Sequence, residues 1–235
     1  MTSIGNPGRF AGALYVLTSI GGFFAMDYVP GKLIVHGNTA ATVNNIAAHE
    51  MLFRFGIAGQ LISQSAFVFV AFALYKLLAG VHRRDAALMV ILIVVSVPIA
   101  FVNELNSLAA LDLVRGSNFL SIVEEPQRHA FAMLFLNLHS RGLVVAELFW
   151  GLWLFPLGLL VFRSRFLPRL LGVWLGLAGS AWVILSLVSV MLPQYQSGVY
   201  RYTQPAVFGE VAFMLWLLIK GAKPPALAPA APPVA

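Results

Sequence analysis

Two glutamates, Glu147 and Glu210, lie inside long apolar runs and are the side chains best placed to do chemistry in an apolar setting. A charge at the centre of a bilayer costs about 2.5–3.5 kcal/mol on insertion scales, so such an acid is expected to face protein and to have a partner. No cation stands three or four positions from either residue. Each must therefore be protonated or meet a partner on another helix.

Amide side chains occupy comparable depths in neighbouring apolar runs. Counting 1.5 Å per residue from the basic end of each run places Gln60 and Glu147 at about 24 Å and Asn103 at about 28 Å. Gln64 and Glu210 come lower, at about 18 and 15 Å, close to the midplane of an apolar core about 30 Å thick. This alignment predicts a polar funnel that is closed towards the basic end of the runs and open at the other.

Three further polar residues mark the expected mouth of this funnel. Arg54, Arg141 and Asn106 each come out at about 33 Å, which meets the outer boundary of the core. The two arginines are the expected gate and the candidate partners of Glu147. The predicted ligand-binding residues are Glu210, Glu147, Arg54, Arg141, Gln60, Gln64, Asn103 and Asn106. The competing interpretation is structural, since buried amides often hold helices together at about 0.6 kcal/mol per contact.

Histidines and carboxylates give only a weak metal signal. His49 beside Glu50, with His139 in a later run, could supply ligands near one surface, but no HExxH-type spacing exists. The chain has no cysteine, which excludes disulfides and thiolate sites. No Walker loop, dinucleotide fingerprint or nucleophile elbow is present, so the sequence predicts neither catalytic residues nor a particular cofactor.

The elements that must position these groups are membrane-spanning helices. Hydrophobic residues make up 60% of the 235 and charged residues 10%, whereas a soluble domain carries about a quarter charged residues. Six stretches reach the length of about 20 residues that a bilayer requires, which predicts one all-α domain over 1–221. These spans run approximately over 10–27, 51–75, 86–107, 130–162, 169–192 and 204–220.

Several spans have features of their own. The first is expected to be a retained helix and not a signal peptide, because its apolar run is long and no clear cleavage site follows. Pro98 should kink the third. The fourth is too long for one crossing, so its first part should project beyond the bilayer or lie along its surface. Thr203 is the candidate N-cap of the sixth.

The segments between and after the spans complete the prediction. Two extracytoplasmic hairpins are expected, over 28–50 and 108–128. Residues 222–235 are rich in proline and alanine, and this composition predicts a disordered cytoplasmic tail. Gly172 and Gly176 form a GxxxG pattern that allows close helix packing or dimerisation.

The distribution of cations predicts the orientation. With Arg54 and Arg141 left aside because they lie within or at the edge of spans, nine lysines and arginines fall on the side that holds the termini and four on the opposite side. The excess places both termini in the cytoplasm. The cations form short clusters between apolar runs, not one patch, which argues against a nucleic-acid partner in spite of the net charge of +6.

Several phrases of the sequence resemble one known family along nearly the whole chain. They are RFAGALYVL (9–17), YVPGKLIVHGNTAATVNNI (28–46), HEMLFRFGI (49–57), VPIAFVNELNSLAAL (97–111), MLFLNLHSRG (133–142), FWGLWLFPLGLLVFRSRFLPRLLG (149–172) and GEVAFMLWLLIKG (209–221). In these phrases the chain resembles the bacterial membrane family known as domain of unknown function 4386 (DUF4386). The resemblance implies a multi-pass protein of the bacterial cytoplasmic membrane and implies no activity.

Three functions remain open on this sequence. The first is binding or transport of a small molecule or lipid through an outward-facing polar cavity. The second is an accessory subunit, in a homo-oligomer or membrane complex, whose polar groups only lock helices together. The third is a membrane enzyme at the outer surface that uses His49, Glu50 and His139. A solvated cavity would favour the first, and a packed interior the second.

Overall fold

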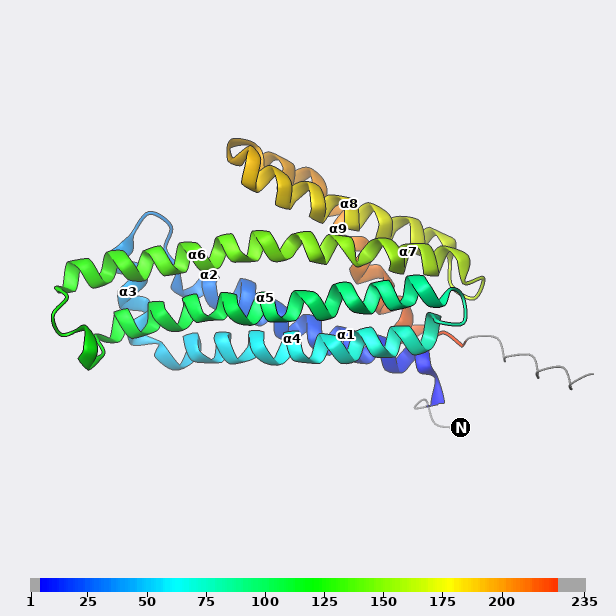
Figure 1. Cartoon of the computed structure of the whole chain (residues 1–235), viewed down its shortest axis with the longest axis horizontal. Helices are drawn as coiled ribbons and strands as arrows, with labels where there is room; N and C mark the ends of the chain where they lie inside the picture. The colour runs from blue at the N-terminus through cyan, green and yellow to red at the C-terminus, as the bar shows by residue number, and fades with distance from the viewer. Residues whose placement is uncertain (1–4, 224–235) are drawn as a thin grey trace, which may run out of the picture.

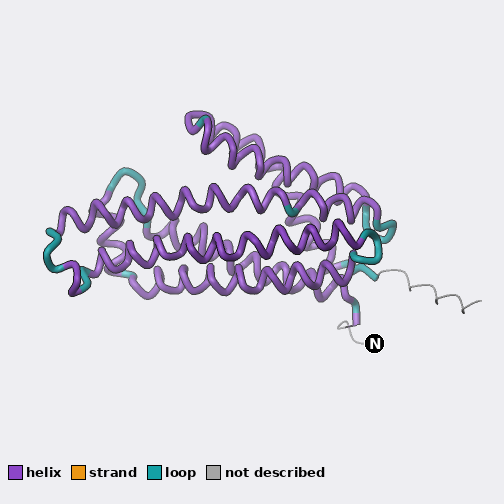
Figure 2. Tube along the Cα trace, viewed as in Figure 1, coloured by secondary structure: helices purple, strands orange, loops and turns teal. Residues whose placement is uncertain are grey.

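All regular structure in residues 5–223, the part of the chain that this computed structural model describes, is helical (Figures 1 and 2). The longer helices are α1 Pro7–Phe23, α4 Glu50–Leu78, α5 Arg83–Arg115, α6 Glu125–Leu152, α7 Leu154–Arg163, α8 Arg169–Met191 and α9 Gln196–Ile219. The shorter ones are η2 Phe24–Tyr28, a π-helical turn, then α2 Val29–Leu33, α3 Thr39–Ala48, η3 Asn118–Leu120 and η4 Pro193–Tyr195.

Six helical segments are long and apolar enough to cross a membrane, and the protein is a multi-pass membrane protein. These segments are Pro7–Leu33, Glu50–Leu78, Arg83–Arg115, Glu125–Arg163, Arg169–Met191 and Pro193–Ile219. Their outward faces carry exposed large apolar side chains such as Leu17, Ile62 and Leu177. Lipid is the solvent that such a surface requires, because water would make its exposure costly.

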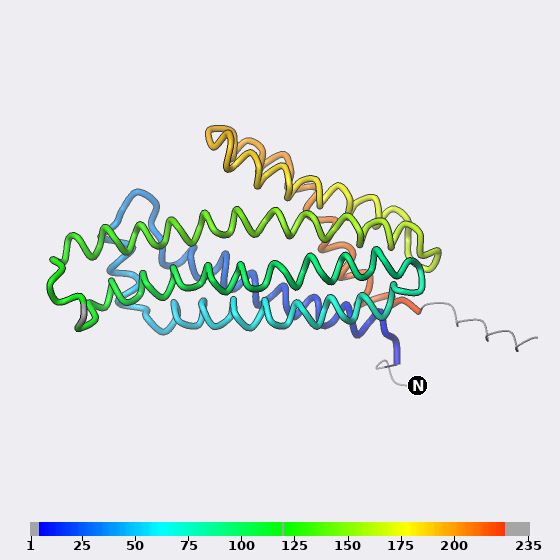
Figure 3. Tube along the Cα trace, viewed as in Figure 1, coloured from blue at the N-terminus to red at the C-terminus, as the bar shows by residue number. Residues whose placement is uncertain are grey.

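The spans form a closed ring. Each packs against the next in the order α1, α4, α5, α6, α8 and α9, and α9 packs against α1. The course of the chain through these helices can be followed by its colour in Figure 3. The contact between α1 and α9 is close because α1 has a glycine, Gly12, where it meets the backbone of Leu217 and Leu218. A Cβ atom at position 12 would overlap that backbone. Both ends of the described chain meet here, and the Gly8 amide donates to the Ala222 carbonyl at 3.1 Å.

The α8–α9 hairpin leaves the bundle at an angle, and its loop stands apart from α6 in Figure 1. Close packing holds its other end. Gly151 of α6 faces Gly179 of α8, and Gly158 of α7 faces Gly172 of α8. A side chain at any of these four positions would collide with the opposite backbone, so the glycines set the interhelical spacing. Of the GxxxG pair, Gly172 makes such a contact, whereas nothing lies within 4 Å of the Cβ position of Gly176.

Two apolar cores are separated by a polar layer. On the buried face of α4, Phe53 and Ile57 belong to one core and Val70 and Leu74 to the other. Between them stand Gln60, Ser63 and Gln64, all buried. The buried face of α5 repeats the pattern, with Ser96, Asn103, Glu104 and Ser107 between Ile93 and Ala110. On α4 and α5 the buried polar groups therefore lie between the two cores.

Several helix boundaries differ from the predicted ones. Helix α9 begins at Gln196, eight residues before the predicted start, and Thr203 is not its N-cap. The Thr203 hydroxyl instead donates to the Val199 carbonyl within the helix at 3.0 Å. Helix α5 runs without interruption through Pro98 to Arg115, so the first part of the predicted hairpin over 108–128, residues 108–115, is helical. The predicted hairpin over 28–50 is largely helical too, because it contains α2 and α3.

The fourth span is divided at Trp153 into α6 and α7. Pro156 lies in the first turn of α7, where its missing N–H breaks no helical hydrogen bond. Helix α6 stays alongside α5 over its length in Figure 1 and does not bend away from the bundle. Ala222, the first residue of the predicted tail, is buried, and its amide donates to Oδ1 of Asn6. Residues 224–235 of that tail lie outside the described residues.

Candidate functional site

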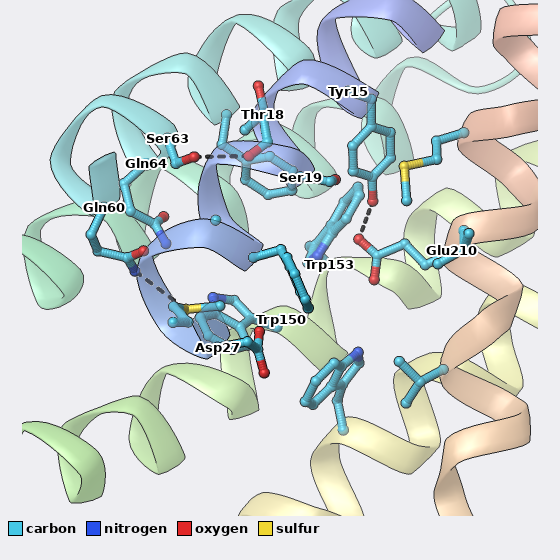
Figure 4. Close-up of a pocket in the computed structure, with 18 residues that line it drawn as sticks. Tyr15, Thr18, Ser19, Asp27, Gln60, Ser63, Gln64, Trp150, Trp153 and Glu210 are labelled. Carbon is cyan, nitrogen blue, oxygen red and sulfur yellow. Dashed lines mark hydrogen bonds between the residues drawn. The ribbon is translucent and has the colours of Figure 1, made fainter. Parts of the chain in front are cut away.

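A cavity of about 340 Å³ lies within the ring, lined by the first, second, fourth, fifth and sixth spans (Figure 4). Its lining is Tyr15, Thr18, Ser19, Gly22, Phe23, Met26, Asp27, Gln60, Ser63, Gln64, Phe67, Trp150, Trp153, Trp182, Val207, Glu210, Val211 and Met214. The cavity reaches the surface beside Phe23 and Asp27, both of which are exposed. It therefore opens at the junction of α1 and η2, on the side of the bundle.

Glu210 is held at one end of the cavity by a residue from the other end of the chain. The Tyr15 hydroxyl of α1 donates a hydrogen bond to Oε1 of Glu210 on α9. Tyr15 is only 1% exposed, and its ring packs against Phe67 and Trp153 with centroids 5.7 and 6.0 Å away. This packing fixes the position of the hydroxyl and, through it, that of the carboxyl group.

Helix α4 supplies the opposite wall. Gln60, Ser63 and Gln64 follow the i, i+3, i+4 spacing that puts side chains on one helix face. The Ser63 hydroxyl donates to the Thr18 carbonyl at 2.8 Å, which fixes α4 against α1. The Gln60 amide donates to the sulfur of Met26 at 3.5 Å. Its Oε1 is buried without a hydrogen-bond partner within the described chain, and Figure 4 shows the amide at the cavity.

Three tryptophans, Trp150, Trp153 and Trp182, form another part of the wall. Trp150 and Trp182 contact each other edge to face with centroids 5.7 Å apart, and Trp153 meets Phe67 in the same way at 5.3 Å. The buried indole N–H of Trp182 approaches the carboxyl group of Glu210, although no hydrogen bond of good geometry joins them. The cavity thus combines aromatic surfaces with a few polar groups that converge on it, as small-molecule sites generally do.

A second and smaller cavity of about 100 Å³ adjoins the first, since Met26 and Gln60 line both. Its polar lining includes Glu104, Ser107 and His139. Glu104 is 4% exposed, and its Oε1 lies 3.8 Å from Nδ1 of His139. The Asn103 amide reaches the carbonyl of His139 at 3.0 Å and so ties α5 to α6.

The structure brings together three of the predicted ligand-binding residues, Glu210, Gln60 and Gln64. The other five, Glu147, Arg54, Arg141, Asn103 and Asn106, line neither cavity. The Asn106 amide donates to the Asn103 carbonyl at 3.2 Å within α5. The Asn103 amide, by contrast, connects α5 to the His139 carbonyl of α6.

Neither candidate arginine forms an ion pair with Glu147 among the described residues. Arg54 pairs instead with Glu50 on its own helix, with Nε and Oε1 2.8 Å apart, and Arg115 approaches the same carboxyl at 3.5 Å. Arg141 is exposed. Oε2 of Glu147 is buried and has no hydrogen-bond partner among the described residues.

Tyr15, Asp27 and Glu104 are the site residues that sequence reasoning missed. Tyr15 gives no polar signal in an apolar helix, and Asp27 stands where the first apolar run ends. Glu104 follows Asn103 in the third run and could have been found by the same argument that selected Glu147. Within residues 5–223, no group of three or more His, Cys, Asp or Glu side chains is arranged to hold a metal ion. His49 is exposed, and its ring contacts the Asn45 carbonyl.

Comparison with known proteins places the chain in a family. An uncharacterised protein of the archaeon Archaeoglobus fulgidus is 37% identical over 76 residues, which are 32% of this chain and 44% of that protein. The matched segment thus spans less than half of the relative's length. No solved structure matches the chain. The model of the family described as Domain of unknown function (DUF4386) matches residues 10–221, and the chain belongs to that family.

Proposed function

We propose that the protein binds a small molecule or lipid in the larger cavity and serves its recognition or transport in the membrane. The observation that carries this proposal is the cavity of about 340 Å³ with Glu210, Gln60 and Gln64 on its wall. Ligand sites commonly occupy about 300–1,000 Å³ and combine apolar walls with a few converging polar groups. An accessory subunit needs no such space, because its polar groups would only have to meet one another.

The side opening supports a route from the membrane. Phe23 is 63% exposed at the rim, and Val207 of α9 is half-buried on the lining. An entrance with apolar groups beside the acid Asp27 suits an amphipathic molecule that dissolves partly in lipid. In this proposal Glu210 is the deep anionic or proton-carrying group, and Gln60 and Gln64 orient the ligand opposite it.

Native mass spectrometry of the protein purified from its membrane tests the proposal. Wild-type protein is expected to carry a discrete additional mass of a small molecule or lipid. Val207→Trp should remove this mass, because the indole would occupy the cavity. Val190→Trp places the same side chain on the exposed face of α8, where Val190 is 65% exposed, and should retain the mass. Absence of a bound mass in the wild type, or its retention in Val207→Trp, would contradict the proposal.

A further inference from the structure

The larger cavity differs in charge from the chain that surrounds it. The protein carries a net charge of +6, but the lining includes two acids, Asp27 and Glu210, and no lysine, arginine or histidine. Neither acid takes part in any ion pair of the described residues. Groups in a cavity enclosed by helices and lipid are poorly screened, so this acidic lining attracts cations and repels anions.

Gln60 gives an independent indication of a ligand. It is 3% exposed, and its unpartnered Oε1 requires a hydrogen-bond donor. A buried acceptor without a donor costs about 1–3 kcal/mol in other proteins, so such an atom on a cavity wall is expected to meet a donor on a ligand. Gln60 and Glu210 lie on opposite walls, from α4 and α9 (Figure 4).

The aromatic lining suits the same class of ligand. Trp150, Trp153 and Trp182 all line the cavity, and tryptophan has the aromatic face that attracts cations most strongly. Aliphatic groups of Val207, Val211 and Met214 provide an apolar surface beside Glu210. A ligand that satisfies both surfaces carries a positive charge and an apolar body.

From these features we infer that the cavity is selective for hydrophobic organic amines in their protonated form. The ammonium group lies between Glu210 and the tryptophans and donates an N–H to Oε1 of Gln60, while Asp27 attracts the cation at the rim. A quaternary ammonium ion fits less well, because it has no N–H for Gln60. This inference rests on the proposed function and names its substrate class.

Four probes of similar shape separate charge from hydrophobicity. They are 4-phenylbutylamine, 4-phenylbutan-1-ol, 4-phenylbutanoate and 4-phenylbutyltrimethylammonium, titrated into the full-length protein in lipid nanodiscs at pH 8. Binding is followed by quenching of tryptophan fluorescence and by isothermal titration calorimetry. The amine is expected to bind at least about tenfold more tightly than the alcohol and the quaternary ion, and the carboxylate most weakly.

Neutral variants assign the selectivity to the two acids. Glu210→Gln keeps an oxygen for the Tyr15 hydroxyl, and Asp27→Asn keeps the shape of the rim. Each should weaken binding of the amine by about tenfold or more and weaken binding of the alcohol much less. Glu147→Gln removes an intramembrane acid that lines neither cavity and should change none of the affinities.

The outcomes separate this inference from the proposed function. An alcohol that binds as tightly as the amine, and is excluded by Val207→Trp, would overturn selectivity for amines and leave the binding function standing. An amine affinity unchanged in both Glu210→Gln and Asp27→Asn would also overturn the inference. Failure of every probe to bind would overturn it too, and the native mass measurement would then decide the proposed function alone.

Discussion

The hydroxyl of Tyr15 on the first helix donates a hydrogen bond to the carboxyl group of Glu210 on the last, across a separation of 195 residues. This contact lies where the ring of helices closes, and it also forms part of the cavity wall. One of the interactions between α1 and α9 that close the ring thus also positions the deepest acid of the proposed site.

Tyr15→Phe should both destabilise the protein and weaken ligand binding. The ring is kept, so packing against Phe67 and Trp153 survives, but the carboxyl group of Glu210 loses its donor. We expect a loss of about 1.5–3 kcal/mol in the free energy of unfolding, as for hydrogen bonds to charged groups. Thermal unfolding in detergent, followed by tryptophan fluorescence, measures this loss of stability.

Tyr75→Phe is the matched control, because no hydrogen bond of the Tyr75 hydroxyl is found among the described residues. Equal stability of the two variants would contradict this role.

Glu147→Gln should not destabilise the protein. Removing a buried charge is costly only when it leaves an opposite charge without its partner, and Arg54 is already paired with Glu50. We expect the free energy of unfolding to stay within about 0.5 kcal/mol of wild type or to rise. The same unfolding measurement checks it. A fall of several kcal/mol would mean that Glu147 does pair with a cation.

Gly12→Ala should disrupt the closure of the ring. A methyl group at this position overlaps the backbone of Leu217 and Leu218, so α1 and α9 must move apart. We expect a loss of about 1–3 kcal/mol, typical of overpacking. Gly176→Ala is the control, because nothing lies within 4 Å of its Cβ position. It should leave stability unchanged or raise it by about 0.5–1 kcal/mol through helix propensity. Similar effects of the two substitutions would show that the contact at Gly12 does not limit stability.

The sequence predicts the spans well because lipid imposes a length and an apolar composition on every crossing. It also predicts the depth of polar groups, and Gln60, Gln64 and Glu210 do meet in one cavity. Depth carries no information on the direction in which a side chain points. Glu147 has the same estimated depth as Gln60 and lines neither cavity.

The rotation of each helix is set by packing that no single run of sequence reveals. Gly142 of α6 packs directly on Asn103 of α5, and Gly151 of α6 on the backbone of α8 at Gly179. These contacts fix which face of α6 turns inward. Tyr15 was missed for a related reason, since only the contact between α1 and α9 shows that its hydroxyl meets Glu210.

The orientation of the bundle in the membrane can be tested by labelling, because the chain has no native cysteine. Arg84→Cys places an exposed thiol at the start of α5, on the side of the ring that holds the termini. Asn118→Cys places one in η3, at the opposite end of the bundle. Asn118 suits this better than Gly116, whose φ of 65° is strained for any other residue.

Cells that express either variant are treated with a membrane-impermeant maleimide while intact. The excess of lysine and arginine on the side of the termini predicts that this side is cytoplasmic, since such clusters are retained during insertion. The thiol of Asn118→Cys should therefore react, and that of Arg84→Cys should stay unlabelled until the cells are permeabilised. Permeabilised cells serve as the control for accessibility, because both thiols should then react equally. Labelling of Arg84→Cys alone in intact cells would reverse the orientation. The opening beside Asp27 would then face the cytoplasmic half of the membrane, and the proposed ligand would enter from that side.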